Sequence, residues 1–162
     1  MTFDEYRGHL RVIREQYGKN IGIEWRKHHL PPVLGFENEV VGWKLTWVGV
    51  FDANKFFLRL REHWSQRDGS YERGFFSYHY GPYEDHWDLE KVNATKVSAR
   101  IDAQDYHGRG FHIHDGAKER RIYQSELRSP KLDETTPADF IHGVVKMRQG
   151  RDLIEAFGLE FI

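Results

Sequence analysis

Hydrophobic positions recur every three or four residues near both ends of the chain, and every second residue in between. Near the N-terminus the apolar residues are spaced to form a single stripe on a helix: Tyr6, Leu10, Ile13 and Tyr17. This spacing predicts a helix over residues 3–17, with Gly18 just beyond its end, where helix C-terminal glycines occur. Tandem prolines, Pro31 and Pro32, cannot continue a helix or an interior strand, so we expect a loop over residues 31–39.

From residue 40 onward, apolar, aromatic and β-branched residues alternate with polar ones, as in strands with one buried face. Residues 56–64 fit both a strand and a helix; a strand is favoured because the neighbouring segments are strands and the connections are short. The alternation predicts strands over 41–51, 56–64, 74–80, 96–103 and 110–115, residues 119–124 can extend this pairing, and residues 21–26 also fit a short strand before the prolines.

A second helical pattern begins near the C-terminus. Thr136 is a typical N-cap, Pro137 suits the first helical position, and Gly150 marks the end. The order of elements therefore predicts an α+β fold: an antiparallel β-meander of about five or six strands, with an N-terminal helix and C-terminal helices packed on one face. We expect a single domain over 1–162, in which 1–30 is a helical N-terminal extension and 40–162 holds the sheet and the C-terminal helices.

Composition restricts the function only loosely. Net charge is −1, from 24 basic and 25 acidic residues, so bulk charge does not indicate binding to nucleic acid. There is no cysteine, which excludes disulfides and thiolate metal sites. No apolar run approaches the roughly 18 residues of a membrane helix, and the N-terminus is acidic without an apolar signal region. We therefore expect a soluble cytoplasmic protein with no membrane partner.

Candidate chemistry concentrates in residues 98–116, a predicted hairpin around a glycine-flanked turn. Arg100 and Asp102 lie two residues apart on its first strand, and His112 and His114 lie two apart on its second. Because side chains alternate across a strand, each pair shares one face. If the two strands pair, all four polar groups gather on one side of the sheet.

Such a cluster suits metal-independent cleavage of RNA, which needs groups that move protons and cations that stabilise the phosphorane-like transition state. Histidine fits the first task near neutral pH. The assignment is as follows: proton transfer by His107, His112 or His114, orientation of an imidazole by Asp102, phosphate binding by Arg100 and Arg109, and a further imidazole and two stacking rings from His79, Tyr78 and Tyr80. The cluster as a whole favours function, although each histidine taken singly is more typical of a packed strand face.

Two other functions fit the same residues. His112 and His114 are spaced to bind one metal ion, with Asp102, His107 or Glu119 as a third ligand. The spacing matches only half of the cupin pattern, and the downstream glycine-proline-glycine-histidine box is absent, so we assign no metal and no cofactor. The other alternative is a protein-binding module without chemistry, an inhibitor or accessory protein, which the near-zero net charge favours over a general nucleic-acid binder.

The segment from residue 43 to about 148 resembles the TumE-like family of toxins from toxin–antitoxin systems. The resemblance lies in Phe76-Ser77-Tyr78-His79-Tyr80, then Arg100-Ile101-Asp102, then a short loop with His107, then His112-Ile113-His114 and a helix near Thr136. The family usually has asparagine after its Arg-x-Asp, where this chain has Ala103. The resemblance implies a small cytoplasmic toxin that acts on RNA or translation and is neutralised by an antitoxin protein.

Overall fold

The computed structural model describes residues 2–52, 55–82, 98–102 and 110–162. Its elements in chain order are α1 (Phe3–Asn20), β1 (Glu24–His29), β2 (Pro32–Leu34), β3 (Val40–Phe51), β4 (Phe56–Arg67), β5 (Ser70–Pro82), β6 (Ala99–Asp102), β7 (His112–Asp115), β8 (Arg120–Tyr123), η3 (Gln124–Glu126), β9 (Leu127–Ser129), η4 (Leu132–Glu134), α2 (Pro137–Arg148), α3 (Leu153–Ala156) and β10 (Glu160–Phe161).

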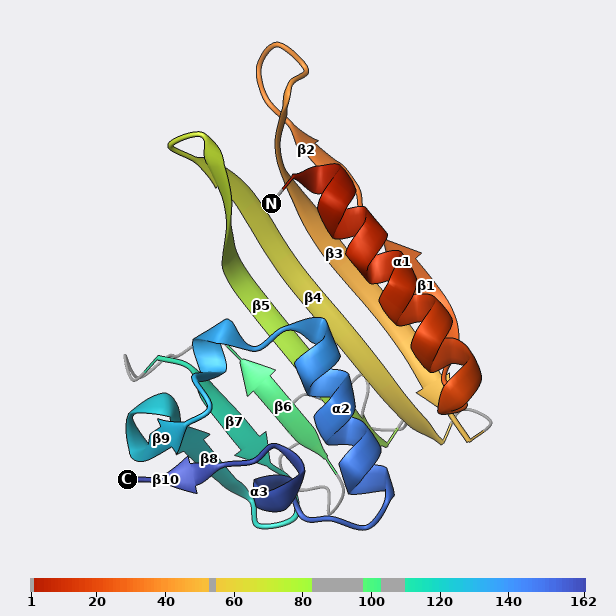
Figure 1. Ribbon diagram of the computed structural model, residues 1–162, viewed down its shortest axis with the longest axis vertical. Helices are drawn as coiled ribbons and strands as arrows, with labels where there is room; N and C mark the ends of the chain where they lie inside the picture. Colours follow the sequence, from red (N-terminus) through yellow and green to blue (C-terminus); the bar gives the residue numbers. More distant parts are fainter. Residues whose placement is uncertain (1, 53–54, 83–97, 103–109) are drawn as a thin grey trace.

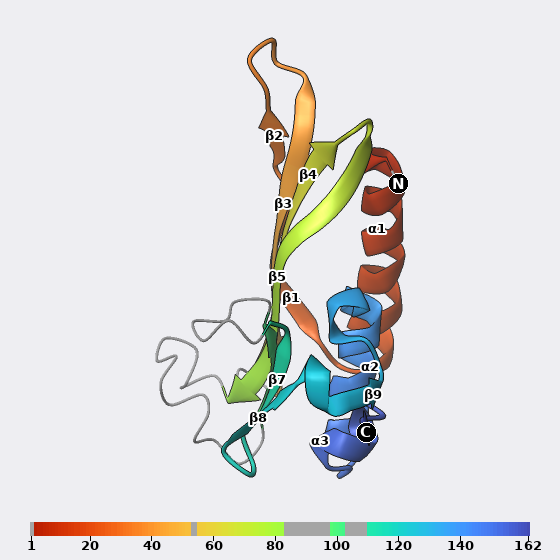
Figure 2. The ribbon, with the colours of Figure 1, turned by 90° about the vertical axis from the view of Figure 1, so that its left-hand side faces the viewer.

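The α+β prediction is confirmed. The main sheet has the order β1-β3-β4-β5-β6-β7-β8, with β2 also paired to β3, and all its described ladders are antiparallel. The helices α1, α2 and α3 all lie on one side of this sheet (Figure 2). The sheet has eight strands, and β9 with β10 forms a separate two-stranded sheet, so the strand number exceeds the five or six predicted.

One of the additional strands lies within residues 31–39, where a loop was predicted. β2 pairs with the first part of β3, from Val40 to Trp43, while β1 pairs with its later part, from Thr46 to Val50. Pro32 is the first residue of β2. Both short strands therefore lie along one edge of β3, which is where a strand containing proline is tolerated.

The N-terminal helix is longer than predicted. Thr2 caps α1, and the side chain of Glu5 completes a capping box. Gly18 does not end the helix, which runs to Asn20. The glycine with a left-handed backbone is Gly22, with a φ of 73°, so the chain turns there toward β1.

Three long strands form the middle of the sheet (Figure 1). β3 and β4 have 12 residues each and β5 has 13. The favoured strand over 56–64 is confirmed, since β4 includes all of it. Asp68 and Gly69 connect β4 to β5 with φ values of 49° and 81°. Two consecutive positive φ values are characteristic of the type I′ turn, which matches the twist of a hairpin.

The core lies between the sheet and its helices. Tyr6 from α1 packs against both Trp43 and Trp64, with ring centroids 5.4 and 5.1 Å apart. From α2, Phe140 packs against Tyr78 at 5.6 Å. As predicted, Thr136 caps α2 and Pro137 starts it. Because the helices cover this face, alternate side chains of every strand are left to form the opposite face.

Candidate functional site

Direct pairing of β5, β6, β7 and β8 forms the candidate site. Arg100 lies opposite His79 on β5 and His114 on β7, while Asp102 lies opposite Ser77 and His112. Residues opposite one another in adjacent antiparallel strands lie on the same face. The structure therefore brings together the residues that alternation in the sequence placed on a common side.

The same register extends across the whole sheet as two rows, on the face opposite the helices. The first row is Lys27, Val48, Arg59, His79, Arg100, His114 and Arg121. The second row is His29, Thr46, Arg61, Ser77, Asp102, His112 and Tyr123. We call these two rows the polar face.

The polar face is strongly basic. Its positions hold five cations, four histidines and one carboxylate, in this order: Lys27, Arg59, Arg61, Arg100, Arg121; His29, His79, His112, His114; Asp102. The whole chain has a net charge of −1. The two rows thus gather positive charge locally, a feature that bulk composition does not reveal.

The single carboxylate of the polar face is paired. Arg100 forms a short ion pair with Asp102, and both side chains are largely buried. The nearby Arg59 lies on β4, where burial first, and then the charges of Arg61 and Arg100, lower its pKa to about 10. Arg59 therefore remains a cation at neutral pH.

The two histidines of β7 are in direct contact. Their Nε2 atoms lie 2.9 Å apart, and the Nδ1 of His112 lies 3.1 Å from the backbone oxygen of Gly110. Burial lowers the pKa of His114 to about 3, assisted by the positive charges of His112, Arg100 and Arg121. His114 is therefore a neutral imidazole at physiological pH.

Accessibility differs between members of the polar face. Arg61 and Arg121 are exposed, whereas His112 is 3 % and His114 is 6 % exposed. His79 is also buried. A ligand arriving from solvent can reach these two arginines directly, whereas the three imidazoles are closed to it.

Tyr78 and Tyr80 are on the opposite face of β5 from His79. Their partners on β6 are Ile101 and Ala99, and they are 0 % and 1 % exposed, respectively. Both rings pack under the helices, so they cannot stack on the bases of a ligand bound to the polar face. The prediction that Tyr78 and Tyr80 bind substrate is therefore wrong, because both belong to the core. Of the three neighbours, His79 is the one that lies opposite Arg100. His107 and Arg109 lie outside the described residues.

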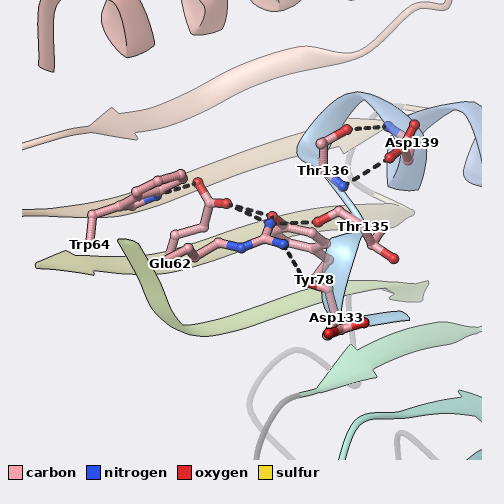
Figure 3. Close-up of polar contacts among 8 residues, drawn as sticks. Glu62, Trp64, Tyr78, Asp133, Thr135, Thr136 and Asp139 are labelled. Carbon is pink, nitrogen blue, oxygen red and sulfur yellow. Dashed lines mark hydrogen bonds and ion pairs between the residues drawn. The ribbon is translucent and has the colours of Figure 1, made fainter. Parts of the chain in front are cut away.

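A buried charged cluster in the core was missed by the sequence analysis. Glu62 is completely buried and accepts a hydrogen bond of 2.6 Å from the hydroxyl of Tyr78. Arg73 lies 3.2 Å from the same carboxylate and donates to the backbone oxygens of Asp133 and Thr135 at 2.9 and 2.5 Å. Figure 3 shows Glu62 and Tyr78 beside the segment that contains Asp133 and Thr135 and leads into the cap of α2.

Burial raises the pKa of Glu62, although the hydrogen bond from Tyr78 and the charge of Arg73 act in the opposite direction. The cluster had a signal in the sequence. Leu58, Leu60 and Trp64 are on the helix-facing side of β4, and Glu62 has the same alternation phase. A carboxylate among apolar positions of one strand face indicates a buried polar partner.

No group of three or more metal-ligating side chains that could hold an ion occurs among the described residues. In the same part of the chain, no helix has the length and apolar character needed to cross a membrane.

Comparisons of the chain with protein-family models, with curated proteins and with solved structures gave no match.

Proposed function

We propose that the polar face binds the phosphodiester backbone of RNA and that the protein is a metal-independent ribonuclease, a toxin of the TumE-like kind. The observation that carries this proposal is the charge of the two rows, with five cations and four histidines around one carboxylate. A basic face on a chain with a net charge of −1 is the electrostatic footprint of a polyanionic ligand.

The proposed reaction is attack of the RNA 2′-hydroxyl on the adjacent phosphorus. The oxygen–phosphorus bond forms, the bond to the 5′ oxygen breaks, and the products are a 2′,3′-cyclic phosphate and a free 5′-hydroxyl. The proton of the 2′-hydroxyl passes to the histidine pair, and the pair returns a proton to the leaving 5′ oxygen, so that it ends the step as it began. Burial lowers the pKa of His114 to about 3, so it is neutral but a weak base in the closed structure; exposure of the ring when substrate binds would raise this pKa and allow it to accept the proton.

Arg100 and Arg59 are placed to hold the phosphate. Arg100 is directly opposite His114 in the ladder, and Arg59 is in the same row beyond His79. Asp102 fixes the guanidinium of Arg100 through their ion pair. Cations held in position stabilise the additional charge that develops on the phosphoryl oxygens in the transition state. Both histidines are buried, so the polar face has to open locally for substrate to reach them.

The test is cleavage of an end-labelled single-stranded RNA by purified protein in the presence of a chelator. We expect products ending in a cyclic phosphate, and a loss of about 100-fold or more in the His112→Ala/His114→Ala variant. The matched control is His28→Ala/His9→Ala, which removes two exposed histidines outside the polar face. Intact RNA, or equal cleavage by the cluster and control variants, would contradict the proposal.

A second candidate function, a transition-metal site, is favoured by the distance between the two imidazoles. Their Nε2 atoms face one another at 2.9 Å, and a small separation of the rings, to roughly 3.3 Å, would suit two ligands of one tetrahedral ion bound at about 2.0–2.1 Å. Elemental analysis of protein purified without chelator tests this alternative. A stoichiometric metal that disappears in His112→Ala, with RNA left intact, would favour it over the ribonuclease.

A further inference from the structure

A second basic surface lies on the helix side of the sheet, between α1 and the edge formed by β1 and β2. It is a groove of about 730 Å³. Arg7, Arg11 and Arg14 line it from α1, and His28 and Leu30 line it from the edge of the sheet. In Figure 1, α1 runs alongside β1 over this edge. We call it the edge groove.

The three arginines form a row. Positions 7, 11 and 14 are spaced four and three residues apart, which places them on one face of a helix. Arg7 is only loosely paired with Asp4, at 3.9 Å and with both side chains exposed. Within the described part of the chain, Arg11 and Arg14 have no carboxylate within 4.0 Å. Asp4 also lines the groove beside Arg7, but Arg11 and Arg14 give it positive charge that no carboxylate of the described residues pairs with.

The strand beside this row has a free edge. Across the described ranges, β1 pairs with β3 and with no other strand. An edge strand presents unpaired backbone N–H and C=O groups, to which an extended peptide can add as a further strand.

Exposed apolar side chains continue along the same edge. Leu34, at the end of β2, is 54 % exposed, and Phe36, in the turn that follows, is 103 % exposed. Large apolar side chains exposed next to a charged groove are typical of a surface that contacts protein. A nucleic-acid backbone would use the arginines, but it would leave both the free strand edge and these apolar groups without partners.

We propose that the edge groove binds an acidic peptide segment of a partner protein, added in extended conformation to β1. Its backbone pairs with the free edge, its carboxylates meet Arg7, Arg11 and Arg14, and apolar residues at one end contact Leu34 and Phe36. The edge groove and the polar face lie on opposite faces of the sheet, so this inference is independent of the proposed ribonuclease.

The experiment is selection of peptides from a random displayed library on the intact protein, followed by binding measurements on the selected peptides. We expect acidic sequences with interspersed apolar residues, and slower amide hydrogen exchange over Glu24–His29 when they bind. The variant Arg7→Ala/Arg11→Ala/Arg14→Ala should lose about tenfold or more of the affinity. Alanine maintains the helix, so the variant should remain folded.

The control variant removes three positive charges elsewhere: Arg128→Ala/Lys131→Ala/Arg151→Ala. It should bind the peptides as the wild type does. Selection without acidic enrichment, affinity that is insensitive to the α1 arginines, or unchanged exchange over β1 would each overturn the proposal. Displacement of the peptides from the groove by poly(U) would overturn it in favour of a nucleic-acid site. RNA cleavage by the three-arginine variant should be normal, which separates this outcome from failure of the ribonuclease proposal.

Discussion

His112 and His114 share a single hydrogen bond between their Nε2 atoms, 2.9 Å apart. The backbone oxygen of Gly110 can only accept, so the Nδ1 of His112, 3.1 Å away, carries a proton. When neither ring carries a charge, this arrangement makes the Nε2 of His112 the acceptor and the Nε2 of His114 the donor. The protonation states of the two imidazoles are therefore linked. If the Nε2 of His112 also carried a proton, two N–H groups would face each other and the hydrogen bond would be lost.

The lowered pKa of His114 predicts a specific dependence of stability on pH. Between its ordinary pKa of 6.5 and its folded value of about 3, the unfolded chain binds a proton that the folded protein does not. The free energy of unfolding should therefore fall as pH falls through this range, by up to about 1.4 kcal/mol per pH unit. Urea denaturation at a series of pH values should show a shallower dependence in His114→Gln than in the wild type. An equal slope in both proteins would contradict the assignment; His9→Gln controls for loss of an exposed histidine.

The exposed arginines of the polar face should control RNA affinity without affecting stability. We expect Arg61→Ala and Arg121→Ala to weaken binding to RNAs of unrelated sequence by similar factors, since contacts to phosphate carry no base specificity. Each substitution should also reduce the slope of log affinity against log salt by about 0.7, if one phosphate contact is lost. Fluorescence anisotropy over a range of salt concentrations measures both effects. Arg128→Ala, on β9, should leave them unchanged.

Two tyrosines in the core should respond differently to loss of their hydroxyl groups. The hydroxyl of Tyr78 donates to the buried carboxylate of Glu62, so Tyr78→Phe should lower the free energy of unfolding by about 1–3 kcal/mol. The buried hydroxyl of Tyr6 has no hydrogen-bond partner among the described residues, so Tyr6→Phe should cost nothing or stabilise the protein. Chemical denaturation of both variants checks this contrast, and an equal loss in the two would be the contrary result.

A pair of glycine substitutions tests the packing of the C-terminal helices. A Cβ at Gly143 of α2 would overlap the ring of Phe157, which follows α3. Gly143→Ala should therefore destabilise the protein by about 1–3 kcal/mol. Gly8 of α1 has nothing within 4 Å of such a Cβ, so Gly8→Ala should stabilise by up to about 1 kcal/mol through helix propensity. Thermal unfolding should shift in opposite directions for the two variants.

Alternation along the strands was sufficient to place part of the polar face. The phase of Arg100 with Asp102, and of His112 with His114, depends only on local geometry, and the pairing of β6 with β7 brings the two pairs together. The same rule, applied strictly, would have separated Tyr78 and Tyr80 from His79, because successive residues of a strand point to opposite faces. Tyr78, His79 and Tyr80 therefore cannot all contact one ligand from the same face of β5.

The remaining parts of the sites depend on which strands become neighbours. Arg59 enters the same row as His114 only because β4, β5, β6 and β7 are adjacent in the sheet. The cluster around Glu62 likewise needs Arg73 from β5 and the backbone carbonyls of Asp133 and Thr135 before α2. No local sequence pattern indicates that these groups come into contact. β2 was missed because a segment with Pro32 satisfies strand geometry only at an edge, and the sequence does not say where edges lie.

Arg73 has a consequence for the order of folding. Its hydrogen bonds to the backbone oxygens of Asp133 and Thr135 join positions 60 and 62 residues apart in the chain, whereas the β4–β5 hairpin closes through a tight turn. Closing a long loop costs more chain entropy than closing a hairpin. The hairpin is therefore expected to form early. The guanidinium of Arg73 then gains its backbone acceptors only when the segment before α2 packs against the hairpin. Arg73 thus couples the docking of the segment before α2 to the completion of the charged core.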